Sequence, residues 1–231
     1  MTEATLAVNF FVALFALIDP IGNVPLFAAA TLGAAAAGRR MVAVYIGLFM
    51  VAFLVFFYFT GVGLLAFFGI SMPAFRIAGG IILFILGLDM VRDDFTTMFA
   101  DAAEGIEGQS PRVYARKSFE RLVVPFAMPL LIGPGSISTV IIYAAEAKEF
   151  GAAGMALGVG VIAAVSVVTV LTFWASPLIS RMLGRIGMSI VVRVLGLILC
   201  ALAVQFVMIG VGDATRGLVR QDAKAPYAES R

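Results

Sequence analysis

The chain has 231 residues, of which 62% are hydrophobic and 13% charged, against about half and a quarter in an average soluble domain. With a mean hydropathy of +1.07, it is expected to lie in a lipid bilayer and has no room for a sizeable soluble domain. The formal net charge of +2 does not indicate nucleic-acid binding, because the cations lie in loops beside apolar segments, as membrane topology requires. A single cysteine, Cys200, excludes an intramolecular disulfide and a cysteine-type metal site.

Six apolar segments are long enough to cross a hydrocarbon core of roughly 30 Å. In chain order they cover 6–31, 42–68, 74–92, 122–146, 152–179 and 190–212. The long polar stretch between the third and fourth segments carries acidic and then basic side chains, which is typical of a solvated linker. We expect one membrane domain over 1–231, with parts at 5–92 (first three-helix half), 93–121 (cytoplasmic polar linker), 122–212 (second half) and 213–231 (polar tail).

The distribution of lysine and arginine predicts the orientation of the chain. The side reached after segments 1, 3 and 5 holds nine cations: Arg39, Arg40, Arg92, Arg112, Arg116, Lys117, Arg121, Arg181 and Arg185. The other side holds five: Lys148, Arg216, Arg220, Lys224 and Arg231. Because cytoplasmic loops carry the excess of Lys and Arg, both termini are expected outside the cytoplasm.

Two short strings recur in the same order in the two halves. The run Leu17–Pro20 matches Leu131–Pro134, and Arg76–Gly79 matches Arg193–Gly196. The spacing from the proline to the arginine is 56 residues in the first half and 59 in the second. Since each half has an odd number of helices, the halves must have opposite orientations. The sequence thus predicts an all-α membrane protein of six transmembrane helices, arranged as two inverted three-helix repeats with helices 1 and 4 discontinuous.

The first segment contains a helix-breaking sequence near the bilayer midplane, about thirteen residues into the helix at ~1.5 Å per residue. Pro20 lacks an N–H group and disfavours the helical conformation at Asp19. Gly22 is permissive, Asn23 can cap a new helix, and Pro25 is tolerated in a first turn. Unwound backbone at this depth is tolerated only where protein buries it or a wet cavity faces it. The break is therefore expected to face inward.

The fourth segment repeats this design with Pro129 and the run Gly133-Pro134-Gly135-Ser136, in which Ser136 is the expected cap. The N–H groups at the start of each restarted helix suit a carboxylate, and the carbonyl groups at the end of the preceding half-helix suit a cation or an ammonium group. An amino acid zwitterion carries both charges. The small side chains around the breaks favour a small substrate. The alternative is that the prolines merely kink the helices.

Three charged residues inside the segments are further candidates for function. Asp19 is costly near the midplane, so it is expected to bind substrate or the coupling ion, with a structural hydrogen bond or ion pair as the alternative. Because the chain has no histidine, proton coupling would rest mainly on carboxylates. Arg76 and Arg193 occupy equivalent positions on opposite sides of the membrane and are candidates for a gate or an ion pair, or for snorkelling to headgroups.

An enzymatic function finds little support. Gly210-Val211-Gly212-Asp213 matches the GxGD string of intramembrane aspartyl proteases, but it lies at the outer end of the last segment, where a buried catalytic dyad could not be built. No HExxH string and no second deep carboxylate facing Asp19 is visible. We predict no enzyme activity, no metal and no cofactor. A passive pore or a non-transporting membrane protein is the alternative to a transporter.

Four strings resemble the MarC family of bacterial and archaeal inner-membrane proteins: Asp19–Phe27, Phe75–Gly80, Pro129–Ile137 and Arg193–Phe206. The resemblance covers roughly residues 5–212. It implies a multi-pass protein of the bacterial inner membrane that transports small neutral amino acids such as glycine, alanine and serine, coupled to a proton or sodium gradient, with an exporter as the alternative. The substrate-binding residues that it implies are Asp19, Pro20, Gly22, Asn23, Gly133, Pro134, Gly135 and Ser136, and Asp19 is also the candidate for the coupling ion.

Overall fold

The computed structural model describes residues 2–31, 34–92, 111–122, 127–128 and 131–215. Most of these residues are helical, and none of them lies in a strand. The helices are α1 (Glu3–Ile18), α2 (Val24–Ala30), α3 (Ala36–Phe67), α4 (Met72–Arg92), α6 (Pro111–Leu122), α7 (Pro134–Lys148), α8 (Gly151–Trp174) and α9 (Ser176–Ala214). The predicted all-helical class is therefore confirmed for the described part of the chain.

Four described helical segments are long and apolar enough to cross a membrane: Ala36–Phe67, Met72–Arg92, Gly151–Leu178 and Ser189–Ala214. They correspond to the predicted second, third, fifth and sixth segments. The first predicted segment is divided into α1 and α2, and the fourth is described mainly from residue 131 onward, where it contains α7. A break within a segment divides it into shorter helices, as in α1 and α2. The arrangement as two inverted repeats stays a prediction.

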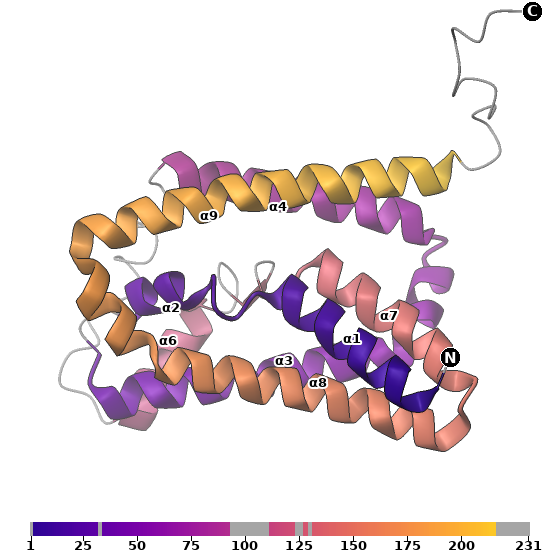
Figure 1. Ribbon diagram of the computed structural model, residues 1–231, viewed down its shortest axis with the longest axis horizontal. Helices are drawn as coiled ribbons and strands as arrows, with labels where there is room; N and C mark the ends of the chain where they lie inside the picture. The colour runs from indigo at the N-terminus through magenta and orange to yellow at the C-terminus, as the bar shows by residue number, and fades with distance from the viewer. Residues whose placement is uncertain (1, 32–33, 93–110, 123–126, 129–130, 216–231) are drawn as a thin grey trace, which may run out of the picture.

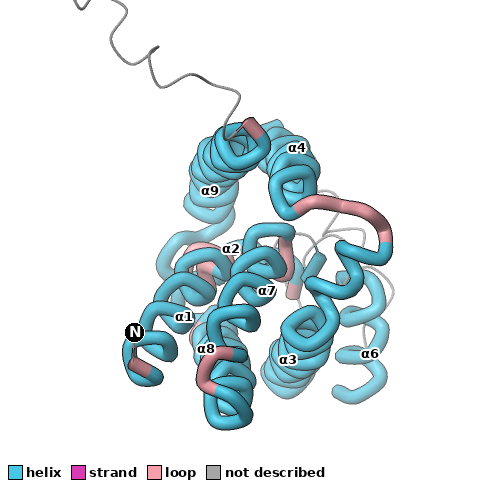
Figure 2. The backbone as a smooth tube through the Cα atoms, turned by 90° about the vertical axis from the view of Figure 1, so that its right-hand side faces the viewer, coloured by secondary structure: helices cyan, strands magenta, loops and turns pink. Residues whose placement is uncertain are grey.

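Helix α4 and the later part of α9 lie side by side as a layer of their own above the other helices, whereas the first turns of α9 descend to the end of α8 (Figures 1 and 2). They run antiparallel, because Gly87 of α4 lies against Gly196 while Gly210 lies against Pro73 and Ile77, near the start of α4. At Gly87 a methyl group would lie 2.8 Å from the Gly196 carbonyl oxygen. Glycine thus lets the two backbones approach closely, as is common for helix pairs in membranes.

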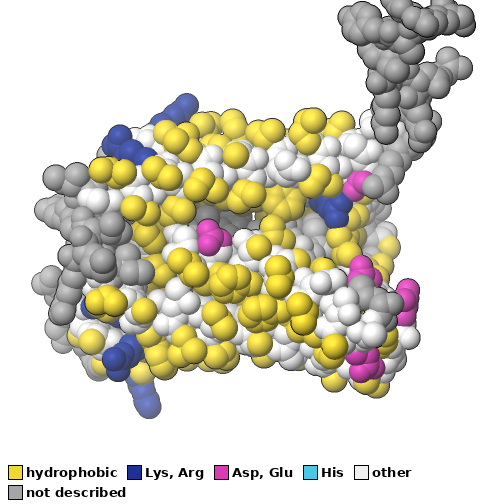
Figure 3. All heavy atoms as spheres, in the orientation of Figure 1, with side chains coloured by type: hydrophobic (Ala, Val, Ile, Leu, Met, Phe, Trp, Pro, Cys, Tyr) yellow, Lys and Arg dark blue, Asp and Glu magenta, His cyan; other side chains and the backbone are white. Residues whose placement is uncertain are grey.

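The second layer holds α1, α2, α3, α6, α7 and α8 (Figure 2). Aromatic rings contribute to its buried core. The Phe10 ring of α1 stacks on Tyr143 of α7 with the ring centroids 4.7 Å apart, and α2 is fixed to α8 by Phe27 on Phe173 at 4.4 Å. Stacked pairs of this kind add roughly 0.5–1.5 kcal/mol to the burial of the rings. The outer surface, in contrast, is largely hydrophobic (Figure 3). An apolar exterior of this extent is expected for a chain whose solvent is lipid.

Two elements differ from the sequence-based boundaries. Helix α9 begins at Ser176 and continues through the predicted loop between 179 and 190, so the fifth and sixth segments are joined by helix. Arg181 and Arg185 lie in that predicted loop, but arginine is a good helix former and does not end a helix. Part of the predicted linker is α6, whose Phe119 packs on Tyr45 and Phe49 of α3. Most of the linker and the tail lie outside the described residues.

Candidate functional site

The first break is centred on Asp19, which ends α1. Asp19 adopts the left-handed conformation with φ 42° and ψ 64°, and its N–H donates to the Phe15 carbonyl. Its exposed carboxylate accepts a hydrogen bond from the Gly22 N–H at 3.0 Å. A side chain at Gly22 would overlap that carboxylate in its observed position, so glycine leaves room for it there. The local sequence therefore both breaks the helix and sets the position of an acidic group.

Asn23 closes the same break from the other side. Its buried side-chain amide donates to the carbonyl oxygens of Ile18 at 2.8 Å and Asp19 at 3.0 Å. The sequence predicts Asn23 as a cap of α2, whereas these bonds satisfy the end of α1. The physical reason is that ending α1 leaves its last carbonyls without helical partners, and the amide nitrogen has two donors to offer them.

The second break ends at Pro134, the first residue of α7. Gly133 is the N-cap residue, in an extended conformation with φ −83° and ψ 175°. The predicted cap, Ser136, is wrong in position, since it lies in the first turn and its hydroxyl donates back to the carbonyls of Gly133 at 2.9 Å and Leu131 at 3.2 Å. Both breaks thus use one buried polar side chain to satisfy freed carbonyl groups. Pro129 lies outside the described residues.

The start of α7 is enclosed by the α4–α9 pair. A side chain at Gly79 of α4 would overlap the ring of Pro134, and one at Gly135 would meet the Phe206 ring of α9, with Cε2 at 2.9 Å. Gly133, Gly135 and Ser136 are buried. The α1–α2 break and the start of α7 both lie near the middle of the long axis (Figure 1). The hydrogen bonds of each break, among the described residues, stay within its own segment.

An acidic group lies beside a hollow on the otherwise apolar face. In Figure 3 this face is hollowed near its middle, between the α4–α9 pair and the helices below, and acidic side-chain atoms lie at its edge. The carboxylate of Asp19 is exposed and Ile21 is 63% exposed, whereas Pro20 and Asn23 are buried. The break therefore presents a carboxylate at its open side. A carboxylate can bind an ammonium group or a metal cation.

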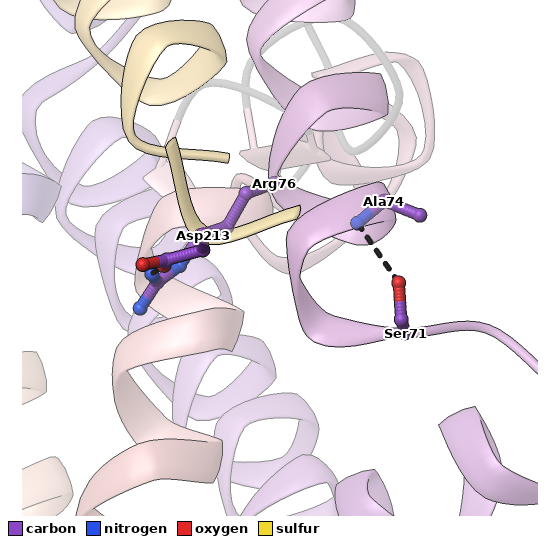
Figure 4. A network of polar contacts seen from close by, with 4 residues as sticks. All are labelled: Ser71, Ala74, Arg76 and Asp213. Carbon is purple, nitrogen blue, oxygen red and sulfur yellow. Dashed lines mark hydrogen bonds and ion pairs between the residues drawn. The ribbon is translucent and has the colours of Figure 1, made fainter. Parts of the chain in front are cut away.

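A second polar feature joins α4 to α9 near the start of α4. The Arg76 guanidinium forms an ion pair with Asp213 at 2.7 Å, with both side chains about four-fifths buried (Figure 4). Ser71 caps the same end of α4 by accepting the Ala74 N–H at 3.3 Å (Figure 4). Arg193 lies exposed near the other end of the pair, since the neighbouring Gly196 contacts Gly87 and Met90. A gating role for either arginine stays a prediction.

Asp213 is the partner that sequence reasoning missed. The residue drew notice only as the end of a GxGD string. The available signal is topological: in an antiparallel pair, a residue at the start of α4 must lie beside the end of α9. As for metals, the part of the chain that the structure describes has no group of three or more His, Cys, Asp or Glu side chains that could hold an ion.

Comparison with known proteins decides the family. The model of the MarC family of integral membrane proteins matches residues 4–215. The chain belongs to the MarC family. Among its MarC relatives, the membrane protein BU267 of Buchnera aphidicola is 32% identical over 94% of this chain and 97% of its own length. MJ1677 of Methanocaldococcus jannaschii is 34% identical, covering 88% and 95%, and YhcE of Escherichia coli is 31% identical, covering 91% and 94%.

The MarC relatives are named as membrane proteins of the UPF0056 group, and no enzymatic family is indicated. No solved structure matches this chain. The family match and the four apolar spanning helices together make this MarC chain a multi-pass integral membrane protein in a lipid bilayer. Its substrate is a separate question, which rests on the chemistry of the breaks.

Proposed function

We propose that this MarC protein is a secondary transporter of small neutral amino acids such as glycine, alanine and serine, coupled to a proton or sodium gradient. One observation carries the proposal: the first predicted membrane segment is interrupted at Asp19, and the interruption leaves a carboxylate exposed in an otherwise apolar segment. A charge near the centre of a bilayer costs at least ~2.5 kcal/mol on the insertion scale, so its presence there indicates a function.

The two breaks offer complementary charges for a zwitterion. The Asp19 carboxylate suits an ammonium group, a sodium ion or a transported proton, and the start of α7 carries the partial positive charge of a fifteen-residue helix. We assign substrate binding to Asp19, Pro20, Gly22, Asn23, Gly133, Pro134, Gly135 and Ser136, and ion coupling to Asp19.

The charge distribution supports an orientation in the bacterial inner membrane. Basic atoms gather at the end of the molecule where α6 lies, and acidic atoms gather mainly at the opposite end (Figure 3). The described cations include Arg40 on α3 and Arg112, Arg116 and Lys117 on α6, all exposed. By the excess of positive charge on the cytoplasmic side, we place the α6 end in the cytoplasm and the N-terminus outside it.

Flux measurements on purified protein in liposomes test the proposal. Radiolabelled glycine, alanine and serine are offered under an imposed proton gradient, a sodium gradient, or neither. We expect saturable uptake of at least one of them that one gradient accelerates, whichever direction the protein favours in the cell. Flux that does not saturate and that no gradient accelerates would indicate a passive pore, and the absence of any flux in either direction would overturn the assignment.

A further inference from the structure

A groove between α3 and α8 lies on the membrane-facing surface, apart from the two breaks. Its volume is about 300 Å³, and its walls are apolar side chains of the two helices. The lining residues are Val44, Gly47, Leu48, Val51, Ser166, Val167, Val170, Leu171 and Trp174. The lone hydroxyl in this set, on Ser166, is turned back to the Ile162 carbonyl at 2.9 Å. The groove therefore offers an apolar channel without a polar group to satisfy.

The groove follows from glycine at position 47. A side chain there would overlap Val170 of α8, so the two helices are in contact at this level and form the floor. Leu48 and Val167 stand on the outer walls and are 62% and 56% exposed. In a bilayer, lipid acyl chains fill such a channel. Because the channel runs along two helices, it suits one extended acyl chain.

One end of the groove carries polar and basic groups. The Trp174 indole N–H donates to the backbone carbonyl of Arg40 at 3.1 Å, which holds the ring at this end. The Arg40 side chain is exposed and lies one helical turn before Val44. Tryptophan at this position is typical of the membrane–water interface, where headgroups lie.

Further positive charge surrounds this end. Arg39 lies next to Arg40 and donates to the Ala34 carbonyl at 3.2 Å, and its buried Nε atom has no hydrogen-bond partner among the described residues. Helix α6 packs on the same end of α3, where Tyr114 lies against Gly38. Its exposed cations lie on the side of α3 away from α8 (Figure 2). The cation at the end of the groove is therefore Arg40, and one Lys or Arg near the membrane surface attracts an anionic headgroup by about 1 kcal/mol.

We propose that this groove is a binding site for an anionic phospholipid, with one acyl chain between α3 and α8 and the phosphate at Arg40. The complementarity of a basic end and an apolar channel carries this inference, which does not depend on the transport function. A zwitterionic lipid would satisfy the channel but gain less from Arg40.

The chain has a single tryptophan, and it stands in this groove, so its fluorescence reports the occupant directly. Protein is reconstituted in vesicles of phosphatidylcholine that contain a fixed fraction of acyl-brominated phosphatidylglycerol, or of acyl-brominated phosphatidylcholine in a parallel sample. Bromine quenches the indole at short range. We expect phosphatidylglycerol to quench Trp174 with an apparent affinity about fivefold higher than phosphatidylcholine, which is the effect of one cation near the surface.

Matched variants separate the headgroup from the channel. Arg40→Gln is expected to abolish the fivefold preference, Arg40→Lys to keep it, and Arg92→Gln, at the exposed end of α4, to leave it unchanged. Val167→Phe should reduce quenching by both lipids, whereas Val62→Phe, on a 51% exposed site of α3 outside the groove, should not. Equal quenching by the two lipids in the unaltered protein would refute the proposal. Quenching that falls as the protein-to-lipid ratio rises would also refute it, because that result indicates that a second copy of the protein occupies the groove.

Discussion

Replacing Asp19 by asparagine is expected to reduce gradient-driven amino acid uptake roughly 10- to 100-fold while the protein stays folded. Asparagine retains an oxygen that can accept the Gly22 N–H and tolerates the left-handed conformation with φ 42°. The substitution therefore removes the charge and little else. A hydrogen bond to a charged group contributes about 1.5–3 kcal/mol, which sets the size of the effect.

Initial uptake rates in liposomes, together with thermal unfolding of the same preparations, measure this effect. Asp89→Asn is the matched control, because Asp89 is a half-buried carboxylate in the last turns of α4, away from either break. We expect the control to transport at the unaltered rate. Equal rates for Asp19→Asn and the unaltered protein would exclude Asp19 from both substrate binding and coupling.

Replacing Gly87 by valine is expected to destabilise the protein by about 1–3 kcal/mol or more, by forcing α4 away from α9. A Cβ atom at Gly87 would lie 2.6 Å from the Cys200 Sγ, 2.8 Å from the Gly196 carbonyl oxygen and 3.0 Å from the Cys200 nitrogen. Two of these three atoms belong to the backbone of α9. They cannot rotate away as a flexible side chain could, so the helices themselves must separate.

Thermal unfolding in detergent compares this variant with Gly63→Val. Gly63 lies in α3, and a Cβ atom there would meet nothing within 4 Å. Both substitutions introduce the same β-branched residue into a helix, so their difference isolates the contact with α9. A shift of several degrees is expected for Gly87→Val alone. If the two variants unfold at the same temperature, the close α4–α9 contact does not stabilise the fold.

The first break could be predicted from sequence because its causes are local. Pro20 and Gly22 act on their own stretch of chain, and they end α1 wherever the rest of the protein lies. The direction of the Asn23 and Ser136 hydrogen bonds could not be predicted in the same way. These side chains can serve either a helix end or a helix start, and which carbonyl groups lack partners is decided by the path of the chain between the two.

Features that depend on packing were harder to predict. The polar composition of residues 111–122 is typical of a linker, but Tyr114 and Phe119 lie five positions apart and both reach α3, which stabilises α6 as a helix. The Arg76–Asp213 pair joins residues 137 positions apart, so only the antiparallel packing of α4 on α9 brings them together. The groove at Gly47 likewise depends on the contact of two distant helices.

Thiol accessibility at position 21 tests most directly whether the first break faces a water-filled substrate site. Cys200→Ser removes the native thiol, and Ile21→Cys then places a single thiol beside Asp19, at a position that is 63% exposed. Because the thiolate reacts, a charged methanethiosulfonate reagent modifies it only where water reaches it. In lipid nanodiscs, with both sides accessible, we expect the Ile21→Cys thiol to react and glycine to slow the reaction, while the thiol of Leu48→Cys, in the lipid-facing groove, stays inert. If the Ile21→Cys variant is as unreactive as the Leu48→Cys variant in this background, the account is contradicted.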